Sequence, residues 1–448
     1  MKVKIRKGYD IKLAGPAKKV IVDHQPEKVA YTLTDFPYLK PKVLVKEGDR
    51  VQAGTPLFCD KKNPEVVFVS PVSGSVEEIR RGDRRVLLNV VIKVEGDEKV
   101  GFATLDQGAI QGLDAGAAKQ ALLERGLWPT LRRRPFHKVA ETSDEPKALF
   151  VSCLDSNPLA ADPNYFLDGR GEDFKAGLSL LSKICPEIHL CLEGNETPSA
   201  TFEAAAGAKV HTFSGKHPRG NLSIHIDKIS PVVRQDQVVW SIRAQDVVSI
   251  GKTLLSGSFD AERIVAWTGP AAKERKYYRT LLGASTSDLP REEGEVRQVS
   301  GSVLAGKATG EEGFVGFYDN TLLAIKEGRE KKLLGWLTPG YYSHSLTRCY
   351  ITNVPVMGMK EYDLTTTTNG EHRAIVDNEM YDKVQPLDIH TSLLYKTMLA
   401  GDIEESERMG LWSVAPEDFA LASYMDPSKN DFGQPLVSML DELYKEEA

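Results

Sequence analysis

The chain has 448 residues, a formal net charge of −6, and 41% hydrophobic and 27% charged residues, values that are ordinary for a globular protein of about two to four domains. The acidic balance argues against nucleic acid as a partner. No apolar run approaches the ~18 residues of a membrane span, and no signal-peptide pattern follows the basic N-terminus. The five cysteines are scattered, without a Cys-x-x-Cys motif. They argue against disulfides, structural zinc and an iron–sulfur cluster, and favour a reducing, cytoplasmic setting.

The N-terminus is strongly basic. Residues 1–19 contain seven basic residues against Asp10. The first four are Lys2, Lys4, Arg6 and Lys7. On the residues alone we favour a solvated strand face for these side chains. The alternative is docking to an acidic partner or to an anionic lipid surface.

Residues 45–57 place two glycine-containing turns between short apolar runs, and residues 70–76 repeat a similar turn one strand later. Glycine can adopt a positive φ at such turns without steric cost. The pattern predicts a folded-over β-sandwich of the biotinyl/lipoyl-carrier type within residues 1–100. A carrier presents one modified lysine at the hairpin tip, but the best-matching position here is Asn63. We therefore interpret the tip as a structural turn and predict no covalently bound cofactor.

Apolar strand patterns and helical periodicity alternate from residue 101 to residue 255. A turn-rich linker leads into a helix over 115–124. Strands are expected at 148–153, 188–192 and 210–213, with helices at 173–184 and 199–206. The alternation predicts a Rossmann-like parallel α/β domain.

The loop at residues 122–131 contains one glycine, Gly126, followed by Leu127 and Trp128. Its place in the chain is similar to that of the glycine-rich loop that holds flavin and NADH in the hydride-accepting subunit of respiratory complex I. That loop needs glycines because backbone N–H groups approach phosphate closely. Bulky side chains at this place predict that a fold resembling the complex I flavin subunit has lost its nucleotide site.

Arg132, Arg133 and Arg134 follow this loop directly, with His137 and Lys138 close behind. These side chains could form a solvated basic turn, or they could grip an acidic partner or a phosphate. The residues give the two interpretations nearly equal weight.

His217 and His225 form the densest histidine patch. Two histidines eight residues apart with no nearby cysteine are weak evidence for a metal site. We expect a loop followed by a strand here.

The last two regions are a small β-grasp (SLBB-like) module at 256–330 and an irregular linker with a C-terminal helical domain at 331–448. Helices are expected after Pro386 and from Pro416. The segment 421–429 resembles one that carries two cysteines in related redox subunits, but the matching positions are Ala422 and Asp426. Without thiolates there, no iron–sulfur cluster is predicted.

Several segments resemble one family, the NqrA subunit of the sodium-translocating NADH:quinone oxidoreductase. They are residues 7–11, 14–16, 40–49, 57–64 and 79–85, and further matches continue to the C-terminus. The resemblance implies a peripheral subunit on the cytoplasmic face of the bacterial inner membrane, without catalytic residues of its own.

The same resemblance implies a set of partners and cofactors. Subunits B to F, chiefly B and C, would bind this chain and would carry NADH, FAD, FMN and the iron–sulfur centres. The complex would reduce ubiquinone and export Na⁺, with this chain as a scaffold near the quinone-reducing end. Direct binding of ubiquinone at or near an interface of this chain is a less favoured hypothesis. The resemblance also shifts weight toward docking by the basic N-terminus.

Three other functions stay open. The chain could be a free-standing flavin-dependent NADH dehydrogenase-like protein, an acyl or biotin carrier, or a non-redox adaptor. The sequence shows no complete Ser/His/Asp, paired-carboxylate or metal-ligand grouping.

Overall fold

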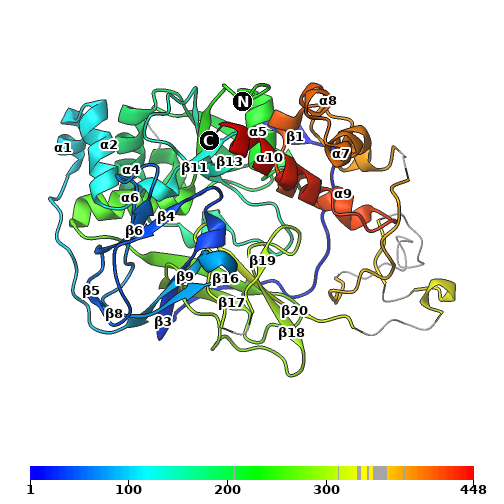
Figure 1. Cartoon of the computed structure of the whole chain (residues 1–448), viewed down its shortest axis with the longest axis horizontal. Coiled ribbons are helices and arrows are strands. Elements are labelled where there is room, and N and C mark those ends of the chain that lie inside the picture. The colour runs from blue at the N-terminus through cyan, green and yellow to red at the C-terminus, as the bar shows by residue number, and fades with distance from the viewer. Residues whose placement is uncertain are drawn as a thin grey trace.

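The computed structural model describes residues 1–204, 207–310, 312–329, 334–340, 343–346, 361–376 and 379–447. Four β-sheets organise these residues, and helices pack against the largest sheet and gather at the C-terminal end of the chain (Figure 1). None of the helices in the described ranges is long and apolar enough to cross a membrane.

The largest sheet has seven strands in the order β1-β14-β13-β12-β15-β10-β11. Their bounds are β1 Lys2–Ile5, β14 Lys209–Gly215, β13 Ile188–Glu193, β12 Leu149–Cys153, β15 Val239–Arg243, β10 Arg132–Arg134 and β11 Lys138–Val139. The first five are parallel, whereas β10 runs antiparallel to β15 and to β11. The predicted parallel α/β sheet is therefore present, with an antiparallel extension at one edge.

Helices cover both faces of this sheet. One face carries α1 Gln107–Gly112, α2 Ala115–Glu124, α4 Gly171–Ile184 and α6 Ala244–Ser256. Alternate strand residues point to opposite faces, so Leu149 and Val151 pack with these helices, whereas Phe150 packs on the side of α5 Leu222–Ile229. The short helix α3 Pro163–Phe166 follows β12.

Two smaller sheets form the carrier-like region. One has four strands, β3 Lys28–Thr32, β9 Leu87–Val94, β8 Gly74–Arg81 and β5 Arg50–Val51, in that order. The other has three, β4 Pro41–Val43, β6 Pro56–Asp60 and β7 Val67–Val69. Their inner aromatic side chains include Tyr31, Phe58 and Phe68, and the core they form continues into the α/β region.

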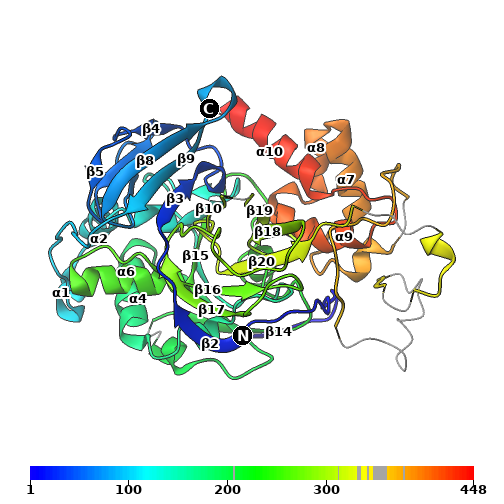
Figure 2. The ribbon, with the colours of Figure 1, turned by 90° about the horizontal axis from the view of Figure 1, so that it is seen from below.

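A six-stranded sheet lies between the carrier-like region and the C-terminal helices (Figure 2). Its order is β19 Lys307–Ala308, β18 Val296–Ser300, β20 Thr321–Lys326, β16 Glu262–Thr268, β17 Lys276–Leu281 and β2 Lys18–Asp23. This sheet contains the strands of the predicted β-grasp module. Strand β2 comes from far upstream in the sequence and pairs in parallel with β17.

The C-terminal region is helical, as predicted. It contains α7 Thr391–Ala400, α8 Ile403–Arg408, α9 Ala420–Met425 and α10 Gly433–Glu447. These helices pack on the α5 side of the large sheet through residues such as Leu394 and Leu436, and Trp412 of the 3-10 helix Leu411–Ser413 joins the same core. Much of the predicted irregular linker, including 347–360, lies outside the described residues.

Several predictions from the sequence differ from the structure. The segment after His217 contains helix α5, not a strand, and His225 lies inside this helix. The segment at 199–206 contains a short 3-10 helix, Ala200–Ala204. Residues 1–100 do not form one sandwich, because β1 joins the seven-stranded sheet and β2 joins the six-stranded sheet. The predicted domain boundaries otherwise stay a prediction.

Candidate functional site

A cavity of about 480 Å³ lies at the carboxyl ends of β12 and β15. The chain leaves β12 toward β13 on one side and later returns to β15 on the other side, so the strand order reverses between β12 and β15. In open α/β sheets, ligands bind in the crevice at such a reversal. The cavity therefore occupies the position where this fold offers a binding site.

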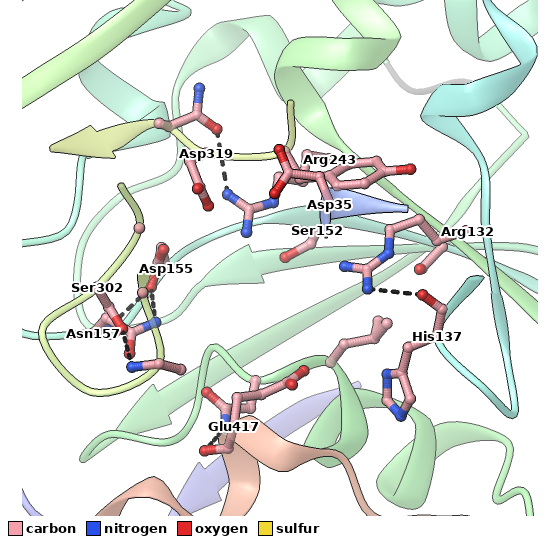
Figure 3. A pocket seen from close by; sticks show the side chains of 18 of the residues that line it. Asp35, Arg132, His137, Ser152, Asp155, Asn157, Arg243, Ser302, Asp319 and Glu417 are labelled. Carbon is pink, nitrogen blue, oxygen red and sulfur yellow. Dashed lines mark hydrogen bonds between the residues drawn. The ribbon is translucent and has the colours of Figure 1, made fainter. Parts of the chain in front are cut away.

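The sheet register places two arginines on the same face of the cavity floor. Arg132 on β10 pairs with Ser241 of β15, and Ser152 on β12 pairs with Arg243 of β15. Because Ser241 and Arg243 are two residues apart on one strand, their side chains share a face. Figure 3 shows the guanidinium groups of Arg132 and Arg243 among the side chains that point into the cavity.

Arg132 and Arg243 hydrogen-bond to neutral oxygens. Arg132 Nη2 donates to the carbonyl oxygen of His137 at 3.0 Å, and its guanidinium lies 4.7 Å from the centre of the Tyr318 ring. Arg243 Nη1 lies 3.5 Å from Asn320 Oδ1. Within the described residues, neither guanidinium has a carboxylate oxygen within ion-pair distance.

The neighbouring Arg133 and Arg134, in contrast, each contact a carboxylate. Arg134 is buried, and it contacts Glu417 Oε1 at 3.2 Å and Ser223 Oγ at 3.0 Å. Arg133 contacts Asp144 Oδ1 at 2.7 Å, with both side chains largely buried. Burial lowers the pKa of Arg134, and the nearby Glu417 carboxylate opposes this shift. Both arginines are therefore paired with carboxylates of the same chain.

The acidic side chains around the cavity are each bound within the chain. Asp35 accepts from Lys307 Nζ and from the Phe317 N–H, both at 2.9 Å. Asp319 accepts from Ser300 Oγ at 2.8 Å; burial raises its pKa, and the nearby Arg243 guanidinium opposes this shift. Asp155 accepts from the backbone and side-chain nitrogens of Asn157. These carboxylates thus accept hydrogen bonds from other donors, and Arg132 and Arg243 form no direct ion pair within the described residues, although Asp319 attracts Arg243 electrostatically.

All parts of the described chain contribute walls to the cavity. Besides the α/β sheet, Asp35 and Tyr38 come from the carrier-like region, Ser302 and Tyr318 from the β-grasp region, and Glu417 from the C-terminal region. Such a cavity depends on how these regions pack together, and a local sequence pattern does not show it.

Sequence reasoning identified Arg132, Arg133 and Arg134 but missed Arg243, Asp155 and Asn157. A signal for the latter two existed, because polar residues directly follow the predicted strand at 148–153, where parallel strands place ligand-binding loops. No strand was expected at 239–243, so the position of Arg243 could not be deduced.

The four basic residues of the N-terminus do not line this cavity. Lys2, Lys4, Arg6 and Lys7 are exposed on and just after β1, while Ile5 is buried. Arg6 and Lys7 border a separate groove that also contains Glu379 and Asp382. The structure therefore separates these side chains from Arg132, Arg133 and Arg134.

The hairpin tip between β6 and β7 is packed against other regions. Asn63 Nδ2 donates to Thr142 Oγ1 at 2.7 Å, and the Lys62 ammonium lies 5.0 Å from the Tyr444 ring centre near the end of α10. The Lys62 ammonium also donates to the Tyr444 hydroxyl at 3.4 Å, so the C-terminal end of α10 contacts this tip. These contacts hold the turn in place, as expected for a structural turn.

The loop around Gly126 is filled by its own side chains. Trp128 is fully buried, its indole N–H donates to the Ala140 carbonyl at 2.7 Å, and its ring packs edge-on against Trp240. Gly126 has a φ of +66°, and a Cβ there would lie 2.5 Å from Val69. This glycine therefore permits a tight turn against the carrier-like core.

Four histidines are buried near the α5 side of the sheet. His189 Nδ1 and His211 Nε2 lie 3.1 Å apart, while His217 bonds Ser156 and His225 bonds the Arg219 carbonyl. Burial lowers the pKa of His217 and of His225 to about 4. Within the described part of the chain, no group of three or more His, Cys, Asp or Glu side chains could hold a metal.

Asp426, at one of the two positions of the C-terminal segment where related subunits carry cysteine, is a fully buried hydrogen-bond acceptor. It accepts from the Tyr381 hydroxyl, the Ser428 and Asn430 backbone N–H groups and the Asn430 side chain, at 2.7–3.0 Å. Burial alone would raise the pKa of Asp426, but these bonds lower it overall. The four described cysteines are buried and unbridged.

Comparisons with known proteins match three parts of the chain to family models. Residues 3–95 match the NqrA N-terminal barrel-sandwich hybrid domain, residues 113–259 the NqrA second alpha/beta domain, and residues 264–310 the NQRA C-terminal domain. The predicted order of carrier-like, α/β and SLBB-type regions is confirmed at this level.

Curated relatives match the whole chain. The NqrA subunit of the Na(+)-translocating NADH-quinone reductase of Vibrio atlanticus is 39% identical over 99% of this chain and 100% of its own length. The corresponding protein from Haemophilus influenzae is also 39% identical over the same shares. A NAD⁺-reducing [NiFe]-hydrogenase structure aligns with 14% identity and a TM-score of 0.41 over 76% of this chain and 64% of its own, which is too low to carry an argument. On the full-length identity, the chain belongs to the family of NqrA subunits of the Na(+)-translocating NADH-quinone reductase.

Proposed function

We propose that this chain acts as a subunit of a complex that reduces ubiquinone with NADH and exports Na⁺. The observation that supports this most strongly is the 39% identity to the Vibrio atlanticus NqrA subunit over 99% of the chain. On this proposal the chain is a peripheral scaffold on the cytoplasmic side of the membrane. Subunits B to F, chiefly B and C, are its partners and carry the redox cofactors.

The filled loop around Trp128 supports a chain without its own flavin. A flavin phosphate needs close approach to backbone N–H groups, and buried indole and leucine side chains occupy that loop. A free-standing flavoenzyme is the rival, and it predicts purified protein with bound flavin. Purified protein without flavin absorbance would exclude the free-standing flavoenzyme.

Ubiquinone contact by this chain is part of the proposal only at an interface with partner subunits. Quinone sites are mostly apolar clefts, whereas the cavity floor carries Arg132 and Arg243. The cavity therefore gives no support to a quinone site inside the isolated chain.

Affinity purification of the tagged chain from native membranes tests the proposal. We expect subunits B to F to co-purify, with NADH-dependent and Na⁺-stimulated ubiquinone reduction in the eluate. Membranes that lack this chain should lose that activity and regain it when the chain is supplied. Recovery of a chain without redox subunits would favour the non-redox adaptor and contradict the proposal.

The exposed basic residues of β1 and the turn after it support an electrostatic contribution to docking. Opposite charges steer association and their effect weakens as salt rises. We expect assembly at ordinary salt to be lost when Lys2, Lys4, Arg6 and Lys7 are all changed to Glu. A matched control reverses four exposed charges on the carrier-like region, at Lys42, Arg81, Arg84 and Arg85. Equal assembly of both variants would refute docking by the N-terminus.

A further inference from the structure

The starting observation is that two arginines at the cavity floor, Arg132 and Arg243, form no direct ion pair within the described residues. Arg132 and Arg243 are both partly buried, and among the described residues they donate to neutral oxygens, the His137 carbonyl and the Asn320 amide. A partly buried charge is costly unless an opposite charge or strong hydrogen bonds compensate it. The compensation from the cavity carboxylates is indirect: Asp319 attracts Arg243 electrostatically, but Asp35, Asp155 and Asp319 accept their hydrogen bonds from other donors.

The backbone adds to this positive region. Helix α6 begins immediately after Arg243, and Ala244 and Gln245 of its first turn line the cavity. No side chain caps this N-terminus, and the acid in its first turn, Asp246, is paired with Arg263 at 2.7 Å. The N-terminal end of a helix favours anions through its N–H groups and its dipole.

We propose that Arg132 and Arg243 bind a small phosphate-bearing dianion in this cavity. Two guanidinium groups on one sheet face balance two negative charges, and each can form paired hydrogen bonds to phosphate oxygens. The hydroxyl-bearing Ser152 lies opposite Arg243, and Ser241 lies opposite Arg132, on the same sheet face. This site goes beyond the subunit role, and it would stand whether or not the chain assembles with redox partners.

The cavity has the size and access that such a ligand needs. Its volume of about 480 Å³ lies within the range of small-molecule sites. Exposed residues at its edge, Ala305, Lys307 and Val437, show where it meets solvent, between the β-grasp region and α10. The ligand is therefore free phosphate or the phosphate of a larger molecule such as a nucleotide, and binding experiments can distinguish these two sources.

The test uses the full-length chain in phosphate-free buffer at low ionic strength, titrated calorimetrically with inorganic phosphate and, separately, with adenosine monophosphate. We expect wild type to bind at least one of them and Arg132→Gln and Arg243→Gln each to bind it at least about tenfold more weakly. Tighter binding of the nucleotide assigns the site to a phosphate ester, and equal or weaker binding assigns it to free phosphate. The control Arg84→Gln removes an exposed arginine of the carrier-like region and should bind as wild type.

A second measurement uses the wild-type protein, so it does not depend on whether a variant folds. Phenylglyoxal modifies arginine, and mass spectrometry locates the products. Phosphate should protect Arg132 and Arg243, and should leave Arg84 reactive. The proposal is overturned if wild type binds neither probe, if the two cavity variants bind as wild type does, or if phosphate protects no cavity arginine.

Discussion

The cavity and the C-terminal helices both bury polar side chains, but they satisfy them differently. Around Asp426, each hydrogen bond to the carboxylate comes from the same short stretch of chain or from Tyr381. At the cavity floor, Arg132 and Arg243 have neutral acceptors and open space before them. We call a buried polar group closed when other groups of the chain satisfy its charge or hydrogen bonds, and such groups stabilise the fold. We call it open when it faces the cavity without an ion pair, and such groups remain available for a ligand. Four sets of variants test this difference, and they are given from the largest expected effect to the smallest.

The Asp426→Ala variant should lose about 4 kcal/mol of unfolding free energy, because it leaves several buried donors without an acceptor. Urea unfolding followed by circular dichroism measures the loss. The control Asp431→Ala removes an exposed carboxylate that accepts one bond, from the Gly433 N–H. This control should lose about 1 kcal/mol of unfolding free energy. An equal loss for both variants would show that the hydrogen bonds to Asp426 contribute no more stability than the single bond to Asp431.

Arg134 and Arg132 lie two residues apart on β10 and provide the most direct comparison. The Arg134→Ala variant leaves Glu417 without its partner and should lose about 3 kcal/mol. The Arg132→Ala variant removes a hydrogen bond to a carbonyl and should lose less than about 1 kcal/mol in phosphate-free buffer. Similar losses in chemical unfolding would contradict the distinction between closed and open arginines.

The buried ring of His225 makes the unfolding free energy depend on pH. Its pKa falls from 6.5 in the unfolded chain to about 4 because burial disfavours the charged ring. The unfolded chain therefore binds the proton first, and stability from this ring is full above pH 6.5 and is lost as pH falls toward 4. At pH 5 the loss should be about 2 kcal/mol relative to pH 7.

Other groups titrate in the same range, so the His225 contribution must be isolated. Burial, and after it Glu417, raises the pKa of Asp418 to about 6, which gives a pH dependence of opposite sign. The measurement is therefore the difference between wild type and His225→Gln in urea unfolding from pH 7 to pH 5. Parallel curves would mean that the ring does not titrate as described.

A small effect is expected at the hairpin tip. The Asn63→Ala variant loses one hydrogen bond to Thr142 and should cost about 1 kcal/mol. The Thr142→Val variant removes the same bond from the other side, and the double variant should cost less than the sum of the two. Additive losses would show that the tip does not depend on this contact.

The sequence predicted most of the secondary structure of the α/β region because its periodicity is strong. The helix at 115–124 has the predicted bounds, and the strand at 148–153 begins one residue later than predicted. The strand predicted after His217 was wrong, because Leu222, Ile224 and Ile226 alternate as in a strand but belong to α5. Short apolar runs cannot distinguish the two structures by pattern alone.

Only some residues of the candidate site could be predicted from the sequence. The Arg132–Arg134 run was visible as charge, but the difference between Arg132, which has no direct ion pair within the described residues, and Arg134, which binds Glu417, depends on a residue 283 positions away. Arg243 joins Arg132 only through strand pairing. Long-range pairing of this kind leaves no local signature in one chain.

Strand β1 has a consequence for how the protein is made. The chain pairs Lys2–Ile5 with Thr212–Gly215, and the Met1 amine donates to Val210, 209 residues away. At about 5–20 residues per second, the ribosome releases this strand on the order of ten to forty seconds before its partner exists. During that interval an edge strand with exposed lysines waits unpaired, and its charges help to keep it from joining another chain.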